Sequence, residues 1–159
     1  MSKIEIQKNK TLKLQNVVSK RFNNILNQED DEEANFENIV SSIDNQIKMK
    51  GAIQIGPLIQ VTDTNVKEDD IDVSISFMLQ ADKFINNVDD GFKEYSVIKE
   101  TNCYYTRFIG LQEDVNYAYQ KIQIEAYEDD VKLSNKTYTI FVDEKDGIST
   151  IDIFMPIEK

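Results

Sequence analysis

The stretch Val18-Ser19-Lys20-Arg21-Phe22 returns later in the chain as Tyr104-Tyr105-Thr106-Arg107-Phe108, and the two arginines are 107 − 21 = 86 residues apart. Each stretch leads through a helical pattern into two strand patterns. These end in Phe77-Met78 and in Phe154-Met155, which are 154 − 77 = 77 residues apart. The difference, 86 − 77 = 9 residues, matches a polar, acidic stretch near Asn23 to Asp31 that occurs in the first copy only. Such an ordered repeat predicts two copies of one supersecondary unit about a pseudo-twofold axis, with a pocket at the seam between them.

The hydrophobic pattern of each copy predicts a strand, a helix and two further strands. In the first copy these are a strand at 12–19, a helix whose apolar stripe is Phe36, Ile39, Val40, Ile43 and Ile47, and strands at 58–62 and 71–77. In the second copy they are a strand at 100–109, a helix at 112–127, and strands at 136–142 and 149–157. We therefore expect an α+β fold. Duplicated βαββ units would form an antiparallel sheet with one main helix per unit on one face and a cleft between the repeats.

The length of 159 residues is typical of one compact domain, 1–159, with repeats at about 12–82 and 95–158. The net charge of −11 argues against binding to nucleic acid and to an anionic membrane surface. No apolar run approaches the roughly 18–20 residues that span a bilayer, and the N-terminus lacks the features of a signal peptide. Because Cys103 is the only cysteine, no internal disulfide can form. We expect a cytoplasmic protein, and the frequent Ile, Lys, Asn and Asp are typical of an AT-rich bacterial genome.

Several kinds of chemistry are absent from the sequence. The chain contains no histidine, which excludes Ser-His and Cys-His relays and histidine-based metal sites. Its acidic stretches lack the spacing of a calcium loop, and it has no glycine-rich phosphate loop. Cys103 is better explained as a small, partly buried hydrophobe than as a nucleophile. We therefore expect a non-enzymatic protein with no metal and no cofactor.

The second copy resembles the gyrase-inhibitor-like (GyrI-like) effector-binding domains. The resemblance lies in the strand end Tyr104 to Gly110, the Tyr117-Ala118-Tyr119 stretch of the helix, and the closing strand Asp152 to Ile157. The first copy, with Gly56-Pro57 before a strand, is similar more weakly. The resemblance covers residues 12 to 158 and implies a duplicated βαββ fold with a small-molecule pocket between the repeats. Many such domains bind lipophilic cations with aromatic rings and a buried glutamate.

One position departs from that family. Its third strand in the second repeat often reads Glu-X-Tyr, where this chain has Thr139-Ile140-Phe141. A buried carboxylate and a cation compensate each other's desolvation, which threonine and phenylalanine cannot do. The resemblance therefore implies the location of a pocket but not a preference for cations. It also disfavours hydrolysis, because the related hydrolases depend on a glutamate with a tyrosine in that pocket.

The candidate ligand-binding residues come from both copies. Thr137, Thr139 and Phe141 share one face of their strand, and by the family match this is the face of the cleft. The remaining candidates are Tyr105, Gln60 and Asp152. Tyr104 and Tyr105 point to opposite faces, so at most one of them lines the cleft. For Asp152 two interpretations stay open: an anionic handle for a ligand, or a carboxylate that is exposed or paired with Lys or Arg.

Two functions from different classes are compatible with these patterns. The first is a non-enzymatic effector-binding module that holds a small apolar or amphipathic molecule in the cleft between the repeats. The second is an adaptor, chaperone or inhibitor with a vestigial pocket, whose acidic surface binds a basic protein partner. The resemblance links this second function to type VII secretion or to gyrase-like targets.

Overall fold

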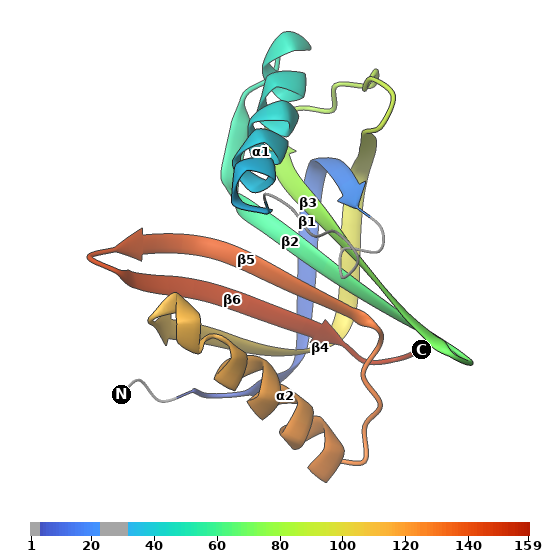
Figure 1. Cartoon of the computed structure of the whole chain (residues 1–159), viewed down its shortest axis with the longest axis vertical. Coiled ribbons are helices and arrows are strands. Elements are labelled where there is room, and N and C mark those ends of the chain that lie inside the picture. Colours follow the sequence, from blue (N-terminus) through green and yellow to red (C-terminus); the bar gives the residue numbers. More distant parts are fainter. Residues whose placement is uncertain (1–3, 23–31) are drawn as a thin grey trace. The chain divides into compact units, whose positions relative to one another are not determined.

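The computed structural model describes residues 4–22 and 32–159, so the acidic stretch near 23–31 lies outside the described residues. The described residues form two α-helices, a short 3-10 helix and six strands, which is an α+β composition as expected (Figure 1). The chain divides into two compact units. The first unit is Leu14–Ile98, and the second unit is Met1–Lys13 together with Lys99–Lys159.

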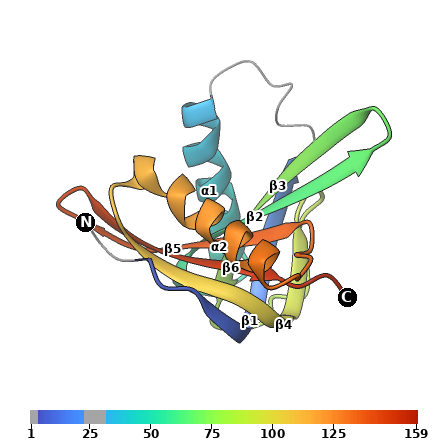
Figure 2. The ribbon, with the colours of Figure 1, turned by 90° about the horizontal axis from the view of Figure 1, so that it is seen from below.

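The first unit has the predicted order of strand, helix, strand and strand. Its elements are β1 (Gln7–Phe22), α1 (Glu32–Met49), β2 (Gln54–Lys67) and β3 (Asp70–Ala81). β3 pairs antiparallel with both β1 and β2. The hairpin of β2 and β3 extends beyond α1 (Figure 2). Ile43 and Ile47 of the predicted helical stripe are fully buried and pack with Val18, Phe77 and Leu79.

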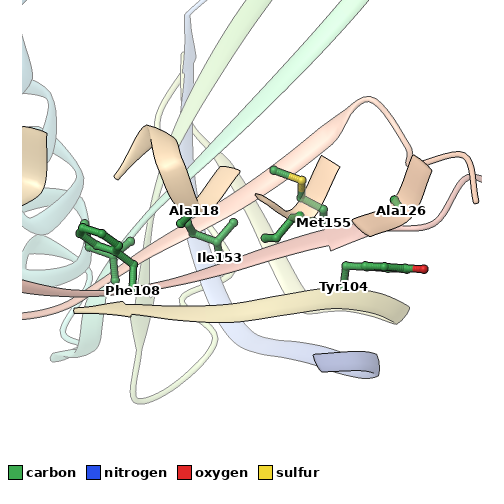
Figure 3. Close-up of a cluster of buried hydrophobic side chains, with 8 residues drawn as sticks. Tyr104, Phe108, Ala118, Ala126, Ile153 and Met155 are labelled. Carbon is green, nitrogen blue, oxygen red and sulfur yellow. The ribbon is translucent and has the colours of Figure 1, made fainter. Parts of the chain in front are cut away.

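The second unit repeats this topology. Its elements are β4 (Lys93–Gly110), the 3-10 helix η2 (Gln112–Asp114), α2 (Asn116–Glu128), β5 (Lys136–Lys145) and β6 (Ile148–Pro156). β6 pairs antiparallel with both β4 and β5, as β3 does with its neighbours. α2 packs on these strands: its buried residues Ala118, Ile122 and Ala126 belong to one core cluster with Ile153 and Met155. Figure 3 shows Ala118 and Ala126 of α2 beside Ile153 and Met155 of β6. Small alanines allow the helix to approach the sheet closely, and the strands supply the bulk of the core.

The first strands of the two units, β1 and β4, share an unusual backbone conformation at equivalent positions. Asn16 and Asn102 are 102 − 16 = 86 residues apart, the offset of the repeated arginines, and both have positive φ, 52° and 56°. Asparagine tolerates this left-handed conformation better than most residues. Both strands are longer than predicted, 7–22 rather than 12–19 and 93–110 rather than 100–109. Each passes from one unit to the other shortly before its asparagine.

The alignment of Phe77-Met78 with Phe154-Met155 is wrong by one residue. The repeated arginines pair with Ser76 and Asp152, so the offset at the last strand is 152 − 76 = 76. Phe77 accordingly belongs to the cluster under α1, whereas in the second unit Met155, and not Phe154, lies in the core. Strand side chains alternate between faces, so a shift of one residue places the two phenylalanines on opposite sides of their sheets.

Among the described residues, neither helix combines the length and the apolar character that a membrane-spanning helix needs.

Candidate binding site

The three-stranded sheet of the second unit has two faces with different surroundings. Directly paired residues share a face, and successive residues alternate between faces. We call the side under the helix the α2 face; its buried strand residues include Tyr104, Phe108, Ile151, Ile153 and Met155. We call the other side the reverse face; it carries the cross-strand pairs Tyr105 with Phe154 and Arg107 with Asp152.

On the reverse face, the carboxylate of Asp152 is held by two neighbours. Arg107 donates from Nε to Oδ1 of Asp152 at 2.8 Å and from a terminal nitrogen to Oδ2 at 2.9 Å. The Tyr105 hydroxyl donates to the same Oδ1 at 2.8 Å, and its ring contacts Phe154 with 4.7 Å between centroids. Two parallel bonds from one guanidinium make a strong and directional pair. The alternative that Asp152 pairs with an arginine is therefore confirmed, and both of its oxygens are engaged.

This arrangement shifts the pKa values of Arg107 and Tyr105. Hydrogen bonding to Asp152, followed by the attraction of its charge, raises the pKa of Arg107 above its already high usual value. Burial raises the pKa of Tyr105, and the hydrogen bond to Asp152 raises it further. At neutral pH Arg107 is therefore a guanidinium cation and Tyr105 is a neutral phenol. Arg107 and Asp152 thus form an ion pair with two hydrogen bonds, to which the Tyr105 hydroxyl adds a third.

On the α2 face, a hydroxyl pair joins the helix to β5. Thr139 lies opposite Ile153, and Phe141 lies opposite Ile151, which places both side chains toward α2. Thr139 is only 2% exposed, and its Oγ1 shares a hydrogen bond of 2.5 Å with the hydroxyl of Tyr119. Phe141 and Tyr119 are partly buried against the core cluster. Burial raises the pKa of Tyr119, while the bond to Thr139 acts in the opposite direction, so the phenol is neutral.

The candidate residues of the second unit lie on both faces of its sheet. Thr139 and Phe141 share the α2 face, and Thr137, half-buried, has the same strand parity. Tyr105 and Asp152 lie on the reverse face, because they pair with Phe154 and Arg107.

Tyr104, the neighbour of Tyr105, is on the α2 face instead. Its hydroxyl donates to Asp129 at 2.7 Å, and burial followed by this bond raises its pKa to about 12. Gln60 lies in the first unit, on β2 opposite Phe77. The structure therefore brings Tyr105 and Asp152 together on the reverse face, and it places Thr137, Thr139 and Phe141 together on the α2 face.

Tyr119 is the residue that the sequence reasoning did not nominate. In the sequence it stands out only as part of the Tyr117-Ala118-Tyr119 stretch of the second helix. Its helical position and the parity of Thr139 together predict a contact between the two, provided that the helix covers that face of β5. The missing information was which face the helix covers.

The described residues contain no group of three or more acidic, cysteine or histidine side chains placed to hold a metal ion. Cys103 is fully buried, and burial, followed by the charge of Glu100, raises its pKa to about 11. Since the thiolate is the reactive form, this cysteine is inert at neutral pH.

No family model and no curated protein matches the chain. Solved structures do match it. A hydrolase from Listeria innocua is 11% identical with a TM-score of 0.60, and the match covers 98% of this chain and 92% of that one. EcmrR, solved in a complex with DNA, is 16% identical with a TM-score of 0.67, covering 99% of this chain and 57% of that one. SAV2435, solved bound to tetraphenylphosphonium, is 11% identical with a TM-score of 0.52, covering 99% and 94%.

Likeness at these identities shows the fold. This chain therefore shares its fold with EcmrR and with SAV2435. The three proteins differ in what they are described as doing, so the fold by itself does not select a function.

Proposed function

We propose that this chain is a non-enzymatic binding module for a small, largely aromatic molecule without a positive charge. The ligand would contact the α2 face of the second unit near Tyr119, Thr137 and Phe141. The observation that carries the proposal is the hydroxyl pair of Tyr119 and Thr139; by the resemblance, the position of Thr139 is the one where GyrI-like domains often carry a glutamate. Support for an aromatic ligand comes from SAV2435, which shares the fold and was solved bound to tetraphenylphosphonium, a small aromatic compound.

The charge preference follows from where the carboxylates are. Burying a cation is costly unless an anionic group compensates it. Asp152 is on the reverse face and is already paired with Arg107. Asp129, near the end of α2, is paired with Lys8 at 2.8 Å and accepts from Tyr104. The Tyr119–Thr139 pair offers a hydroxyl donor instead, which suits a neutral hydrogen-bond acceptor on the ligand.

The non-enzymatic part of the proposal rests on the reactive groups of the chain. Without a histidine, and with Cys103 buried as a thiol, neither of the common activated nucleophiles is available. Within residues 4–22 and 32–159, the Tyr119 hydroxyl has no carboxylate partner that would act as a general base; its partner is the Thr139 hydroxyl.

Calorimetric titration with two related compounds tests the proposal. Triphenylphosphine oxide is neutral and has a strong acceptor oxygen, whereas the tetraphenylphosphonium cation has similar aromatic groups and a positive charge. We expect the oxide to bind roughly tenfold more tightly than the cation, because the site has a donor and no free anion. Tighter binding of the cation, or no binding of either compound, would contradict the proposal.

The variant Tyr119→Phe locates the site. It removes the hydroxyl while keeping the ring, so we expect affinity for the oxide to fall about fivefold, the effect of one net hydrogen bond. The matched control is Tyr117→Phe, the same change two residues earlier on the exposed side of α2. Equal affinities of the two variants would show that the ligand does not bind at this hydroxyl.

A further inference from the structure

The side of α2 that faces away from its sheet carries a stripe of large apolar side chains. Tyr117 is 66% exposed, Ile124 is 58% exposed and Tyr127 is 83% exposed. The buried residues of the helix, Ala118 and Ile122 among them, lie on the opposite side, as the helical period requires. The helix is therefore apolar on two sides, and only one side is accounted for by the core of its unit.

The stripe is hollowed as well as apolar. Gln120, Gln123, Ile124, Tyr127 and Glu128 line an open depression of about 430 Å³ along the helix. Neutral Gln120 and Gln123 lie between the apolar residues, and Lys121, one turn from both Tyr117 and Ile124, donates from Nζ to the backbone oxygen of Ile4. We call Tyr117, Ile124 and Tyr127 with these glutamines the outer surface of α2. Contiguous exposed apolar surfaces of this kind often mark sites of interaction.

Negative charge lies at both ends of this outer surface. Glu113 and Asp114 precede the helix, and Glu128 and Asp130 are at its end, where no basic residue lies in the last turn. Within residues 4–22 and 32–159 none of these four carboxylates forms an ion pair. Asp114 and Glu128 are 128 − 114 = 14 residues apart, which corresponds to about 20 Å along a helix.

We propose that the outer surface of α2 binds an amphipathic helix of another protein, with an apolar side and with lysine or arginine at both ends. Tyr117, Ile124 and Tyr127 would pack against the apolar side, and the four carboxylates would pair with the basic ends, about 20 Å apart. A second copy of this chain fits less well. If two outer surfaces met around a twofold axis, the acidic ends would face acidic ends. This interaction goes beyond the proposed small-molecule function and does not depend on it.

Two synthetic helical peptides test the charge of the partner. Both carry the same leucine side over about four turns; one has two lysines at each end, and the other has two glutamates there. Binding to the full chain is measured by fluorescence anisotropy at about 50 mM and about 500 mM salt. We expect the lysine peptide to bind at least tenfold more tightly at low salt and the difference to shrink at high salt. Equal affinities at low salt would overturn the proposal.

Variants of the chain separate this surface from the general attraction of an acidic protein for a basic peptide. Ile124→Ser should weaken binding of the lysine peptide about tenfold, whereas Ile148→Ser, at an exposed isoleucine in the β5–β6 hairpin, should leave it unchanged. The combined variant Glu113→Gln, Asp114→Asn, Glu128→Gln and Asp130→Asn should remove the preference between the peptides. Loss of affinity in neither isoleucine variant, or in both, would refute the assignment. So would a dimer, measured by light scattering, that Ile124→Ser dissociates, since the occupant would then be a second copy.

Discussion

Replacing Thr139 by glutamate introduces the acid that the resemblance to GyrI-like domains implies at this position, and it tests how the α2 face works. The side chain at this position is 2% exposed, and its polar neighbour is the Tyr119 hydroxyl. Desolvation favours the neutral form of a buried carboxyl, so we expect its pKa in the folded state to rise about two units above the value near 4.3 in the unfolded chain. Two units correspond to about 2.7 kcal/mol.

The sign of the pH dependence follows from linkage. An acid with a raised pKa binds more protons in the folded chain than in the unfolded chain, so stability falls as pH rises through the interval between the two pKa values. Below about pH 4 the variant loses nothing by this effect, and above about pH 7 it loses the full amount. For a chain of this length, the loss corresponds to a decrease of about 8 °C in Tm.

The assay compares melting temperatures of Thr139→Glu and Thr139→Gln between about pH 4 and pH 8. Glutamine has the same shape without the charge, so its curve serves as the baseline. If the ligand binds here, tetraphenylphosphonium should raise the Tm of the glutamate variant at pH 8 and have little effect on the glutamine variant. Parallel pH curves for the two variants would show that this position is not buried as the structure has it. A cation effect equal in both would refute the assignment of the ligand to this face.

Two further predictions concern the core of the second unit. Ile122→Ala, at a fully buried position, should lower the free energy of unfolding by about 2–4 kcal/mol, whereas Ile124→Ala on the same helix should change it by less than about 0.5 kcal/mol; chemical denaturation measures both. Similar losses would mean that the helix is rotated relative to the structure. One phenol should ionise only near pH 12 in a spectrophotometric titration, and Tyr104→Phe should abolish that step, because burial and Asp129 raise the pKa of Tyr104 to about 12. Retention of the step in this variant would assign it to another tyrosine.

Much of each unit could be predicted from local patterns. The alternation of apolar residues in β3 and β6 and the helical stripe with Ile43 and Ile47 are properties of short segments. The repeat was detectable because similar residues surround Arg21 and Arg107, which are 86 residues apart. Asn16 and Asn102, which both have positive φ, are separated by the same number of residues. These features need no knowledge of what lies across the sheet.

The site could be predicted only in part. The parity of β5 correctly grouped Thr139 with Phe141, but it could not show that α2 covers their side of the sheet. The choice of Tyr105 over Tyr104 depended on that same fact, and each has a different carboxylate partner. Tyr119 was missed because its contact with Thr139 joins a helix to a strand 20 residues away.

The order of strands and helices and the acidic balance are determined by the sequence alone, because they depend on residues close together in the chain or on a simple count. The duplication is determined by it too, because two segments of one chain can be compared directly. Only the tertiary structure decided which face of the sheet the helix covers, that Asp152 is neutralised by Arg107, and that the outer surface of α2 is exposed. The physical reason is the period of two in a strand: a shift of one residue in the pairing exchanges the faces completely. That pairing is set by residues 45 positions apart, such as Arg107 and Asp152, and by the packing between them and their neighbours.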